Sequence, residues 1–143
     1  MNFLNDKFIA SGQSFIMPGL IYSIQLHLAS HRHFDLRLQA GSVLKSWAIP
    51  KEPPKGMEKR LAVQTEDHDL GYWNFEGRID EGAYGAGEVS VWDSGTYDVI
   101  DRKPYKWVIE ISGKKLKGKF VLIKLKREDP KDRNWLFFKK KDD

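Results

Sequence analysis

The amino-acid sequence predicts an all-β fold with little helix, built from antiparallel hairpins that form a sandwich or a barrel. Short runs rich in apolar residues recur along the chain, and turn-forming residues separate them at fairly regular intervals. Polar and apolar residues alternate strictly in the clearest of these runs, as they do in a strand with one face in a core. No segment has the periodicity of an amphipathic helix of several turns. Together these three observations favour a single layered β-domain.

The first three strands are expected over residues 20–28, 33–39 and 42–49. A short connection that contains His31 joins the first two, and we expect this histidine to be exposed and not to bind a metal. Gly41 follows the second strand, and a glycine there can supply the positive φ of a tight hairpin turn. These segments therefore predict two successive antiparallel hairpins.

A proline-rich loop follows the third strand. Three prolines between residues 50 and 54 exclude a continuing central strand and favour an extended loop. Lys51 lies at the mouth of this loop, where the hairpin return would bring it near the end of the second strand. The next strand, 61–66, is expected to deliver Asp67 and His68 into a loop.

Glycines dominate residues 75–87, which could be mistaken for a phosphate-binding loop. The segment lacks the Lys-Ser/Thr ending of a P-loop and no helix is predicted after it, so we reject that interpretation and expect sharp bends at a barrel rim. Gly118 is expected to mark a bulge. The remaining strands are expected at 88–93, 96–100, 107–112, 116–125 and 135–139, with turns at Ser94-Gly95, Gly113 to Lys115 and Pro130 to Asp132.

Composition indicates one ordinary globular domain. The chain has 143 residues, of which 41% are hydrophobic and 31% charged. It contains no cysteine, which excludes a disulfide framework and a thiolate metal site. No apolar run approaches the length of a membrane span, and the N-terminus lacks the plan of a signal peptide. We therefore expect a cytoplasmic protein with no membrane association.

Positive charge is concentrated late in the chain. Residues 114–127 include seven basic side chains and no acidic one, and three lysines follow at 139–141. Such patches suit a polyanion such as nucleic acid. Solvated strand faces and tails have the same composition, so the charge alone is weak evidence for a nucleic-acid partner.

Metal-competent side chains share one face of the first hairpin. Because side chains alternate along a strand, His33, Asp35 and Arg37 lie on one face, and Gln25 and His27 share a face of the preceding strand. Two imidazoles and one carboxylate can hold a divalent ion while leaving coordination positions open, and an arginine nearby suits phosphate oxygens. The same run could equally be the wet face of an antiparallel sheet, so the spacing alone leaves a metal site open.

Seven short segments stand in one order between residues 21 and 97 and carry a family resemblance. They are Gln25-x-His27-x-Ala29-x-x-x-His33-x-Asp35-x-Arg37-Leu38, Leu44-Lys45-Ser46-Trp47-Ala48-Ile49-Pro50-Lys51, Lys59-Arg60-Leu61-Ala62-Val63, Glu66-Asp67-His68, Phe75-Glu76-Gly77-x-Ile79, Gly82-x-Tyr84-Gly85-Ala86-Gly87 and Trp92-Asp93-x-Gly95-x-Tyr97. Together they resemble the 3′-phosphoesterase domain of bacterial DNA ligase D and its free-standing archaeal relatives. Seven motifs in one order are far more specific than any of them alone.

This resemblance implies an all-β fold, a single compact antiparallel β-barrel with little helix, over one domain of residues 1–143. Residues 1–19 are expected to form an irregular N-terminal arm. The implied activity is a manganese-dependent phosphoesterase that trims and dephosphorylates 3′ ends of DNA or RNA during repair, with Co²⁺ or Zn²⁺ as alternative metals. The arm departs from the family pattern, which leaves open the balance between removal of a 3′-phosphate and of a 3′-terminal ribonucleoside.

The resemblance also implies roles for individual residues. The metal-binding positions of the family correspond to His27, His33 and Asp35. The catalytic and phosphate-binding positions correspond to Arg37, Lys51 and His68. His68 is expected to hydrogen-bond the transferring phosphate, with a role as general acid ranked second. Further positions expected to support the site are Gln25, Ser46, Arg60, Glu66 and Tyr72.

The implied partner is nucleic acid, a duplex with a recessed or ribonucleotide-containing 3′ end, with separate ligase or polymerase repair proteins as further partners. Two alternatives stay open. One is a non-catalytic nucleic-acid-binding β-barrel whose metal site is structural, for which the basic stretch from Lys114 and the many aromatic residues would also serve. The other keeps the enzyme but changes the substrate to a cyclic or small phosphodiester.

Overall fold

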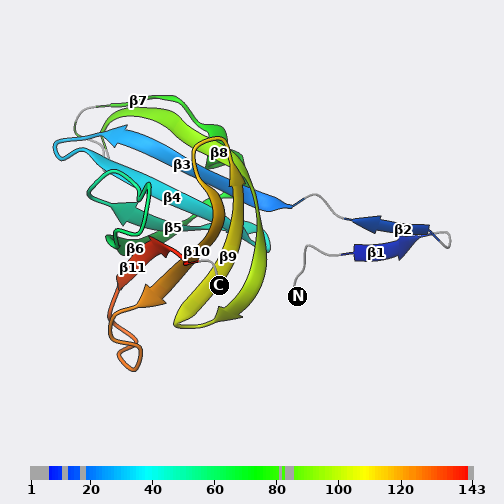
Figure 1. Cartoon of the computed structure of the whole chain (residues 1–143). Helices are drawn as coiled ribbons and strands as arrows, with labels where there is room; N and C mark the ends of the chain where they lie inside the picture. The colour runs from blue at the N-terminus through cyan, green and yellow to red at the C-terminus, as the bar shows by residue number, and fades with distance from the viewer. Residues whose placement is uncertain (1–6, 11–12, 17–18, 81, 83–85, 142–143) are drawn as a thin grey trace.

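Eight antiparallel strands close into a barrel in the computed structural model of the chain, which describes residues 7–10, 13–16, 19–80, 82 and 86–141 (Figure 1). The hydrogen-bonded order is β3-β4-β5-β6-β11-β10-β9-β8, and pairing of β3 with β8 closes the ring, while β7 adds to β8 outside it. The predicted all-β barrel is therefore confirmed. The strands of this sheet are β3 (Leu20–Leu28), β4 (His33–Ala40), β5 (Val43–Ile49), β6 (Arg60–Asp69), β7 (Gly77–Ile79), β8 (Gly87–Lys103), β9 (Lys106–Gly113), β10 (Lys117–Lys124) and β11 (Asn134–Lys139).

Helix is limited, among the described residues, to η1 (Leu70–Asn74), a single short 3₁₀ segment between β6 and β7. Its backbone is joined to β3 by side chains of that strand: the Ser23 hydroxyl donates to the Trp73 carbonyl, and the Gln25 amide donates to the Tyr72 carbonyl. The η1 segment therefore lies over the outer wall of the barrel at β3. No helix in the described part of the chain has the length and apolarity needed to span a membrane.

The core fills the inside of the barrel. Side chains of β3, β4 and β5 supply much of it, and β8 to β11 supply most of the rest. The largest fully buried side chains of the core are Trp47, Tyr22, Tyr97, Phe34, Phe120, Phe137, Ile24, Leu36, Leu38, Leu44, Ile49 and Ile109. Leu36 and Leu38 belong to this core cluster, so Asp35 and Arg37, one position removed, lie on the outer face of the wall. The chemistry-bearing face of the hairpin is thus the outside of the barrel.

The N-terminal arm is more regular than predicted. Strands β1 (Lys7–Ala10) and β2 (Gln13–Ile16) pair in antiparallel register and form a separate two-stranded sheet. The expectation of an irregular arm over residues 1–19 is corrected for these two stretches. Two β-prone runs separated by Ser11 and Gly12 are a hairpin signal, although those two residues lie outside the described part of the chain.

The turn predicted at Ser94-Gly95 does not form. Strand β8 runs through it without interruption, with Gly95 opposite Tyr22 on one side and Gly113 on the other. A Cβ atom at Gly95 would clash with the Ser112 carbonyl oxygen. The glycine therefore permits close approach of two strands, a non-local role that a turn-forming residue type does not reveal.

Two further local predictions are corrected. Strand β6 continues to Asp69, so Asp67 and His68 lie in a strand and not in a loop. Gly118 pairs with Ile111 in an unbroken register and is not a bulge; its φ of 111° explains why glycine stands there. The interruptions of register lie instead at Ile24/Gln25, Leu44/Ser46 and Val99/Asp101.

Candidate metal and phosphate site

The register of the first hairpin brings the three predicted metal ligands together. In the β3–β4 pairing His27 lies opposite His33 and Gln25 opposite Asp35. Asp35 Oδ2 is 3.7 Å from His27 Nδ1 and 3.3 Å from His33 Nε2. One candidate ligand atom from each residue lies within 4.8 Å of the others, so His27, His33 and Asp35 can together hold a metal ion.

The His33 ring is oriented by a backbone group. Its Nδ1 lies 3.1 Å from the His31 carbonyl oxygen, and an Nδ1–H donor there leaves the Nε2 lone pair facing Asp35. When the ring is charged, Nε2–H instead donates to Asp35; this hydrogen bond raises the pKa of the His33 imidazole, and partial burial opposes this. His31 itself is exposed, as expected, but its carbonyl takes part in positioning the His33 ring.

Asp35 is a buried carboxylate that its neighbours keep ionised. Only 7% of the residue is exposed. Burial opposes ionisation, yet the hydrogen bond with His33 and the charge of Arg37 hold the pKa of Asp35 below its ordinary value. The Arg37 guanidinium approaches the same Oδ2 atom at 3.6 Å. Asp35 therefore offers an anionic oxygen at neutral pH, the kind of donor atom that divalent cations prefer.

Arg37 is held in place from several sides. Its Nε donates to Gln25 Oε1 at 2.9 Å, and the Gln25 amide nitrogen donates to the carbonyl oxygens of Tyr72 and Phe75 at 2.9 and 3.0 Å. The guanidinium carbon also lies 5.1 Å from the centre of the Tyr72 ring. Gln25, which is fully buried, thus joins the guanidinium to the segment that covers it.

His68 reaches this group from β6. Its ring packs against Tyr72 with centroids 4.9 Å apart, and its Nδ1 lies 3.2 Å from an Arg37 nitrogen and 3.1 Å from the Glu66 carbonyl oxygen. Nδ1 cannot accept from Arg37 and donate to Glu66 at once, so two tautomers compete. Burial and the charge of Arg37 lower the pKa of His68. Its neutral form is therefore favoured at neutral pH.

The other predicted residues lie less directly in the site. Lys51 is exposed just beyond the end of β5, where Ile49 pairs with Phe34, the neighbour of His33. Arg60 donates through Nε to the Glu52 carbonyl oxygen at 2.7 Å and so holds the loop that carries Lys51.

Ser46 and Glu66 contribute no side chain to the cluster. Ser46 is fully buried opposite Arg37, and its hydroxyl donates to the Leu44 carbonyl beside the register break in β5. Glu66 is exposed and meets His68 through its backbone oxygen. The described structure thus assembles His27, His33, Asp35, Arg37, Gln25, His68 and Tyr72 into one group, and leaves Lys51, Arg60, Ser46 and the Glu66 carboxylate at its edge.

Sequence reasoning missed Ser23 and Phe75. The Ser23 hydroxyl, fully buried, donates to the Trp73 carbonyl at 2.6 Å, and the Phe75 ring stacks on Tyr72 with centroids 5.0 Å apart. Ser23 lies two residues before Gln25 and therefore shares its strand face, a signal that could have found it. Phe75 heads one of the seven segments that carry the resemblance, but its packing role in the covering segment is not indicated by any local pattern.

Comparison with known proteins gives the family. The family model of the DNA ligase D 3′-phosphoesterase domain matches residues 25–124. The chain belongs to this family. The matched residues begin at Gln25 and include every member of the assembled group.

Several multifunctional relatives contain a stretch similar to this chain. The multifunctional non-homologous end joining protein LigD of Pseudomonas aeruginosa is 43% identical over 130 residues, covering 86% of this chain and 15% of that protein. The multifunctional non-homologous end joining DNA repair protein LigD of Mycobacterium tuberculosis is 42% identical over 111 residues, covering 74% of this chain and 15% of that protein. The multifunctional non-homologous end joining protein LigD of Mycolicibacterium smegmatis is 37% identical over 150 residues, covering 96% of this chain and 17% of that protein. The chain thus spans about one sixth of the length of these members of the DNA ligase D group.

Proposed function

We propose that this chain is a metal-dependent phosphoesterase that removes a 3′-phosphate from DNA or RNA ends, with removal of a 3′-terminal ribonucleoside as a second activity. The observation that carries the proposal is the packing of the His27, His33 and Asp35 cluster beside the buried Arg37 guanidinium. A structural metal site would need no buried cation next to it. A phosphate-cleaving site needs such a cation, because charge must be stabilised on the phosphate oxygens in the transition state.

Mn²⁺ is the proposed metal, with Co²⁺ or Zn²⁺ as alternatives, and the donor set fits these ions. Two imidazole nitrogens and one ionised carboxylate oxygen suit divalent transition metals and leave further positions free. His27, His33 and Asp35 would hold the ion. When bound, it would neutralise a phosphate oxygen and lower the pKa of a bound water.

Arg37 and His68 are proposed to hold the phosphate. Arg37 is already oriented by Gln25 and Tyr72, so little side-chain freedom would be lost when its remaining N–H groups meet phosphate oxygens. The lowered pKa of His68 favours a neutral ring that hydrogen-bonds the phosphate over a resting general acid. Lys51 would approach from its exposed loop as a third phosphate contact.

The supporting residues would act through Arg37, His68 and Lys51. Gln25 orients Arg37, and Tyr72 packs on both Arg37 and His68. Arg60 would position the Lys51 loop through the Glu52 carbonyl, Ser46 would support β5 beside Arg37, and Glu66 would select the His68 tautomer through its carbonyl oxygen.

The proposed substrate is a nucleic-acid duplex with a recessed or ribonucleotide-containing 3′ end. The relatives are named for non-homologous end joining, which supports a role in DNA repair. We further propose that the chain acts in the cytoplasm, together with separate ligase or polymerase proteins. The exposed lysines of β10 and its flanking turns, within residues 114–127, would supply sequence-independent attraction to the phosphate backbone.

Phosphate release from a 3′-phosphate-terminated primer-template in the presence of Mn²⁺ tests the proposal. We expect release by the parent protein and its loss in His33→Ala. The matched control is His31→Ala, which removes an exposed imidazole two residues away and keeps the His31 backbone carbonyl. No release by the parent protein, or equal release by His33→Ala, would refute it. Salt-sensitive end binding without turnover would favour the non-catalytic barrel, and preference for cyclic or free nucleotides would favour the small phosphodiester.

A further inference from the structure

Two exposed cations lie at the end of the barrel next to the metal cluster, and neither is a proposed metal ligand or catalytic residue. Arg32 directly precedes His33, the first residue of β4, and Lys115 lies in the turn between β9 and β10. Neither cation is in any of the ion pairs between described residues. Arg32 and Lys115 together are called the basic rim below.

One pair of aromatic residues supports both cations of the basic rim. The Arg32 guanidinium carbon lies 5.3 Å from the centre of the Phe34 ring, and Lys115 Nζ lies 4.4 Å from the centre of the Trp92 ring. Phe34 and Trp92 meet edge to face, with ring centroids 5.7 Å apart. Because the two rings adjoin, they hold the two positive charges close together at one end of the barrel.

The turn that carries Lys115 is anchored by a buried carboxylate. Asp93 Oδ1 accepts hydrogen bonds from the backbone N–H groups of Lys114 and Lys115, at 2.9 and 3.0 Å. Its Oδ2 accepts one from the Leu116 N–H at 2.9 Å. The backbone of Lys115 is therefore fixed, so binding of a phosphate would order only the outer part of its side chain.

Positive charge outweighs negative charge around the basic rim. Glu52 is paired with Lys55 at 2.9 Å. This hydrogen-bonded pairing, together with the charges of Arg32 and Lys115, holds the pKa of Glu52 below its ordinary value. One carboxylate thus faces three cations, and the exposed Lys51 precedes it in the same loop. Such an excess of positive charge attracts a ligand that carries several phosphates.

The basic rim lies where a strand could continue from the proposed phosphate site. Arg32 and His33 are neighbours, so their Cα atoms are about 3.8 Å apart, and successive nucleotides of one strand are spaced by about 3.4 Å along a duplex axis. Arg37 and the metal ligands lie on the outer wall, whereas the Phe34 ring beneath Arg32 belongs to the core. A strand whose 3′ end lies at the metal cluster can therefore place an earlier phosphate over the rim.

We propose that the basic rim binds backbone phosphates of the strand whose 3′ end is processed, within a few nucleotides of that end. This inference rests on the proposed function, because it takes the 3′ end to lie at the metal cluster. The Arg32 guanidinium can donate to phosphate oxygens while its face stays on the Phe34 ring, and Lys115 adds a second charge. Contacts of this kind fix the position of the strand and read no base.

Salt-dependent binding measures the number of phosphates that the rim contacts. Fluorescence anisotropy follows a labelled primer-template with a 3′-phosphate, in the presence of a chelator so that no turnover occurs. We expect Arg32→Ala and Lys115→Ala each to raise Kd by about three- to tenfold. Between about 50 and 200 mM salt, each should also reduce the slope of log Kd against log salt by about one.

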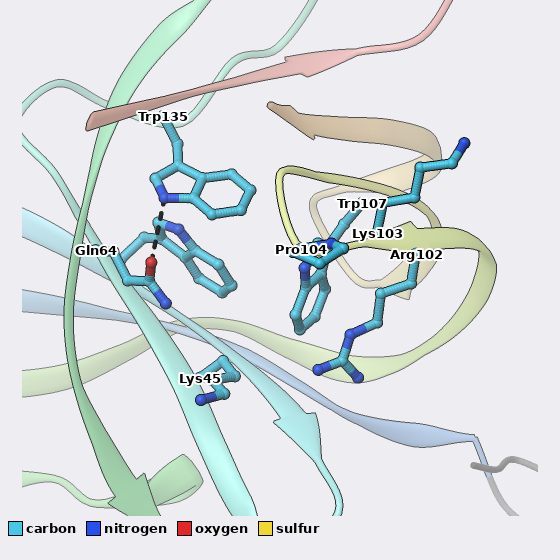
Figure 2. Close-up of a pocket in the computed structure, with 8 residues that line it drawn as sticks. Lys45, Gln64, Arg102, Lys103, Pro104, Trp107 and Trp135 are labelled. Carbon is cyan, nitrogen blue, oxygen red and sulfur yellow. Dashed lines mark hydrogen bonds between the residues drawn. The ribbon is translucent and has the colours of Figure 1, made fainter. Parts of the chain in front are cut away.

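Arg102→Ala and Lys103→Ala are the matched controls, because each also removes one exposed cation. Figure 2 shows both residues beside the pocket at the β8–β9 turn, which lies at the opposite end of β9 from Lys115. Arg102 matches Arg32 in its surroundings as well, since its guanidinium carbon lies 4.0 Å from the centre of the Trp107 ring. The net charge is the same in all four variants, so only the position of the lost cation differs. The controls should bind within about twofold of the parent.

A neutral linkage locates the contacted phosphate. One methylphosphonate, which keeps the backbone but removes a charge, is placed in turn at each of the linkages next to the 3′ end. At one of them it should weaken binding by the parent and leave Arg32→Ala unchanged, because the variant has already lost the partner of that phosphate. Equal weakening of both proteins at every linkage would overturn the proposal.

The proposal is also overturned if the primer-template does not bind saturably, if the rim variants bind as the controls do, or if an acidic peptide competes as well as an oligonucleotide of equal charge. Circular dichroism checks that each variant is folded, and Arg32→Gln repeats the loss of charge with a longer side chain. Phosphate release is measured separately with Mn²⁺. Its absence from a parent protein whose binding depends on Arg32 would refute the catalytic proposal alone, and normal release with rim variants that match the controls would refute the rim alone.

Discussion

Gln25 and Arg37 are joined across the β3–β4 hairpin by a hydrogen bond of 2.9 Å from the guanidinium Nε to the amide Oε1, in a fully buried position. The other end of the same amide donates to two carbonyl oxygens of the segment that covers the outer wall. The neutral Gln25 side chain thereby holds both the Arg37 guanidinium and the segment that covers it. Gln25 therefore orients Arg37 together with the Asp35 carboxylate, which lies 3.6 Å from the guanidinium.

Gln25→Leu should therefore impair catalysis without removing the metal ligands. Arg37 would lose its orientation and two carbonyl oxygens would lose a donor, so we expect phosphate release to fall by about 10- to 100-fold while the Kd for Mn²⁺ changes little. Steady-state kinetics and calorimetry measure the two effects. Gln39→Leu, which changes a half-buried glutamine on β4 away from the cluster, is the control. Equal loss of metal affinity in Gln25→Leu would contradict this role.

Asp35→Asn should abolish tight metal binding. The substitution keeps the shape of the side chain but removes the only anionic ligand of the cluster, so we expect the Kd for Mn²⁺ to rise by about 100-fold or more. Isothermal titration calorimetry measures it directly. Asp98→Asn, an exposed aspartate on β8, should bind the metal as the parent does. A metal affinity unaffected by Asp35→Asn would show that the ion is held elsewhere.

The metal-free and metal-bound proteins should respond oppositely to pH. The folded pKa of His33 is raised, so its charged form stabilises the metal-free fold fully below the unfolded pKa of about 6.5, and this contribution is lost as the pH rises through the higher folded pKa. Metal binding needs the neutral ring and should strengthen over the same interval. Thermal melts measure how the stability of the metal-free protein changes between pH 6 and pH 8.5, and Mn²⁺ titrations measure how the metal affinity changes over the same interval.

His33→Gln is the comparison for this pH dependence. The variant lacks the titrating imidazole but keeps a hydrogen-bonding side chain. Its metal-free stability should therefore vary less over this interval. Parallel slopes of the metal-free parent and the variant would exclude His33 as the group responsible.

Asp93→Asn should destabilise the fold. Asp93 is 3% exposed and accepts hydrogen bonds from the backbone N–H groups of Lys114, Lys115 and Leu116 and from the Tyr22 hydroxyl at 2.7 Å. An amide in its place cannot accept all four, and we expect the free energy of unfolding in urea to fall by about 2–3 kcal/mol at pH 7. Asp98→Asn on the same strand should change it by less than about 0.5 kcal/mol.

The same carboxylate should contribute to acid sensitivity. Burial opposes its ionisation, but the four hydrogen bonds hold the pKa of Asp93 below its ordinary value. Its contribution is therefore fully present above the unfolded pKa of about 3.9 and is lost as the pH falls through the lower folded pKa. The difference between parent and Asp93→Asn should shrink between pH 5 and pH 2. A constant difference would contradict this assignment.

The parts of the site that follow from strand alternation could be predicted from the sequence. Asp35 and Arg37 share a face because they are two residues apart, and a tight hairpin brings His27 opposite His33. The parts that depend on backbone groups or distant strands could not. The His31 carbonyl that orients His33 belongs to a residue whose side chain is exposed, so no residue type indicates it.

Closure of the barrel accounts for most of the remaining differences. Ser94-Gly95 has the composition of a turn, but the approach of the Ser112 backbone decides its role. Likewise, Trp47, Trp107 and Trp135 come from three strands and meet only when β5, β9 and β11 enclose one interior. Lys51 remains a prediction, because its flexible side chain lies on an exposed loop.

A crystal of the protein soaked with Mn²⁺ and sulfate, with anomalous scattering used to locate the metal, would test the proposed metal and phosphate site most directly. We expect a manganese peak bound by His27, His33 and Asp35, and a sulfate in contact with Arg37 and His68 beside it. A manganese peak away from these three residues, or a metal-bound cluster whose sulfate contacts neither Arg37 nor His68, would contradict it.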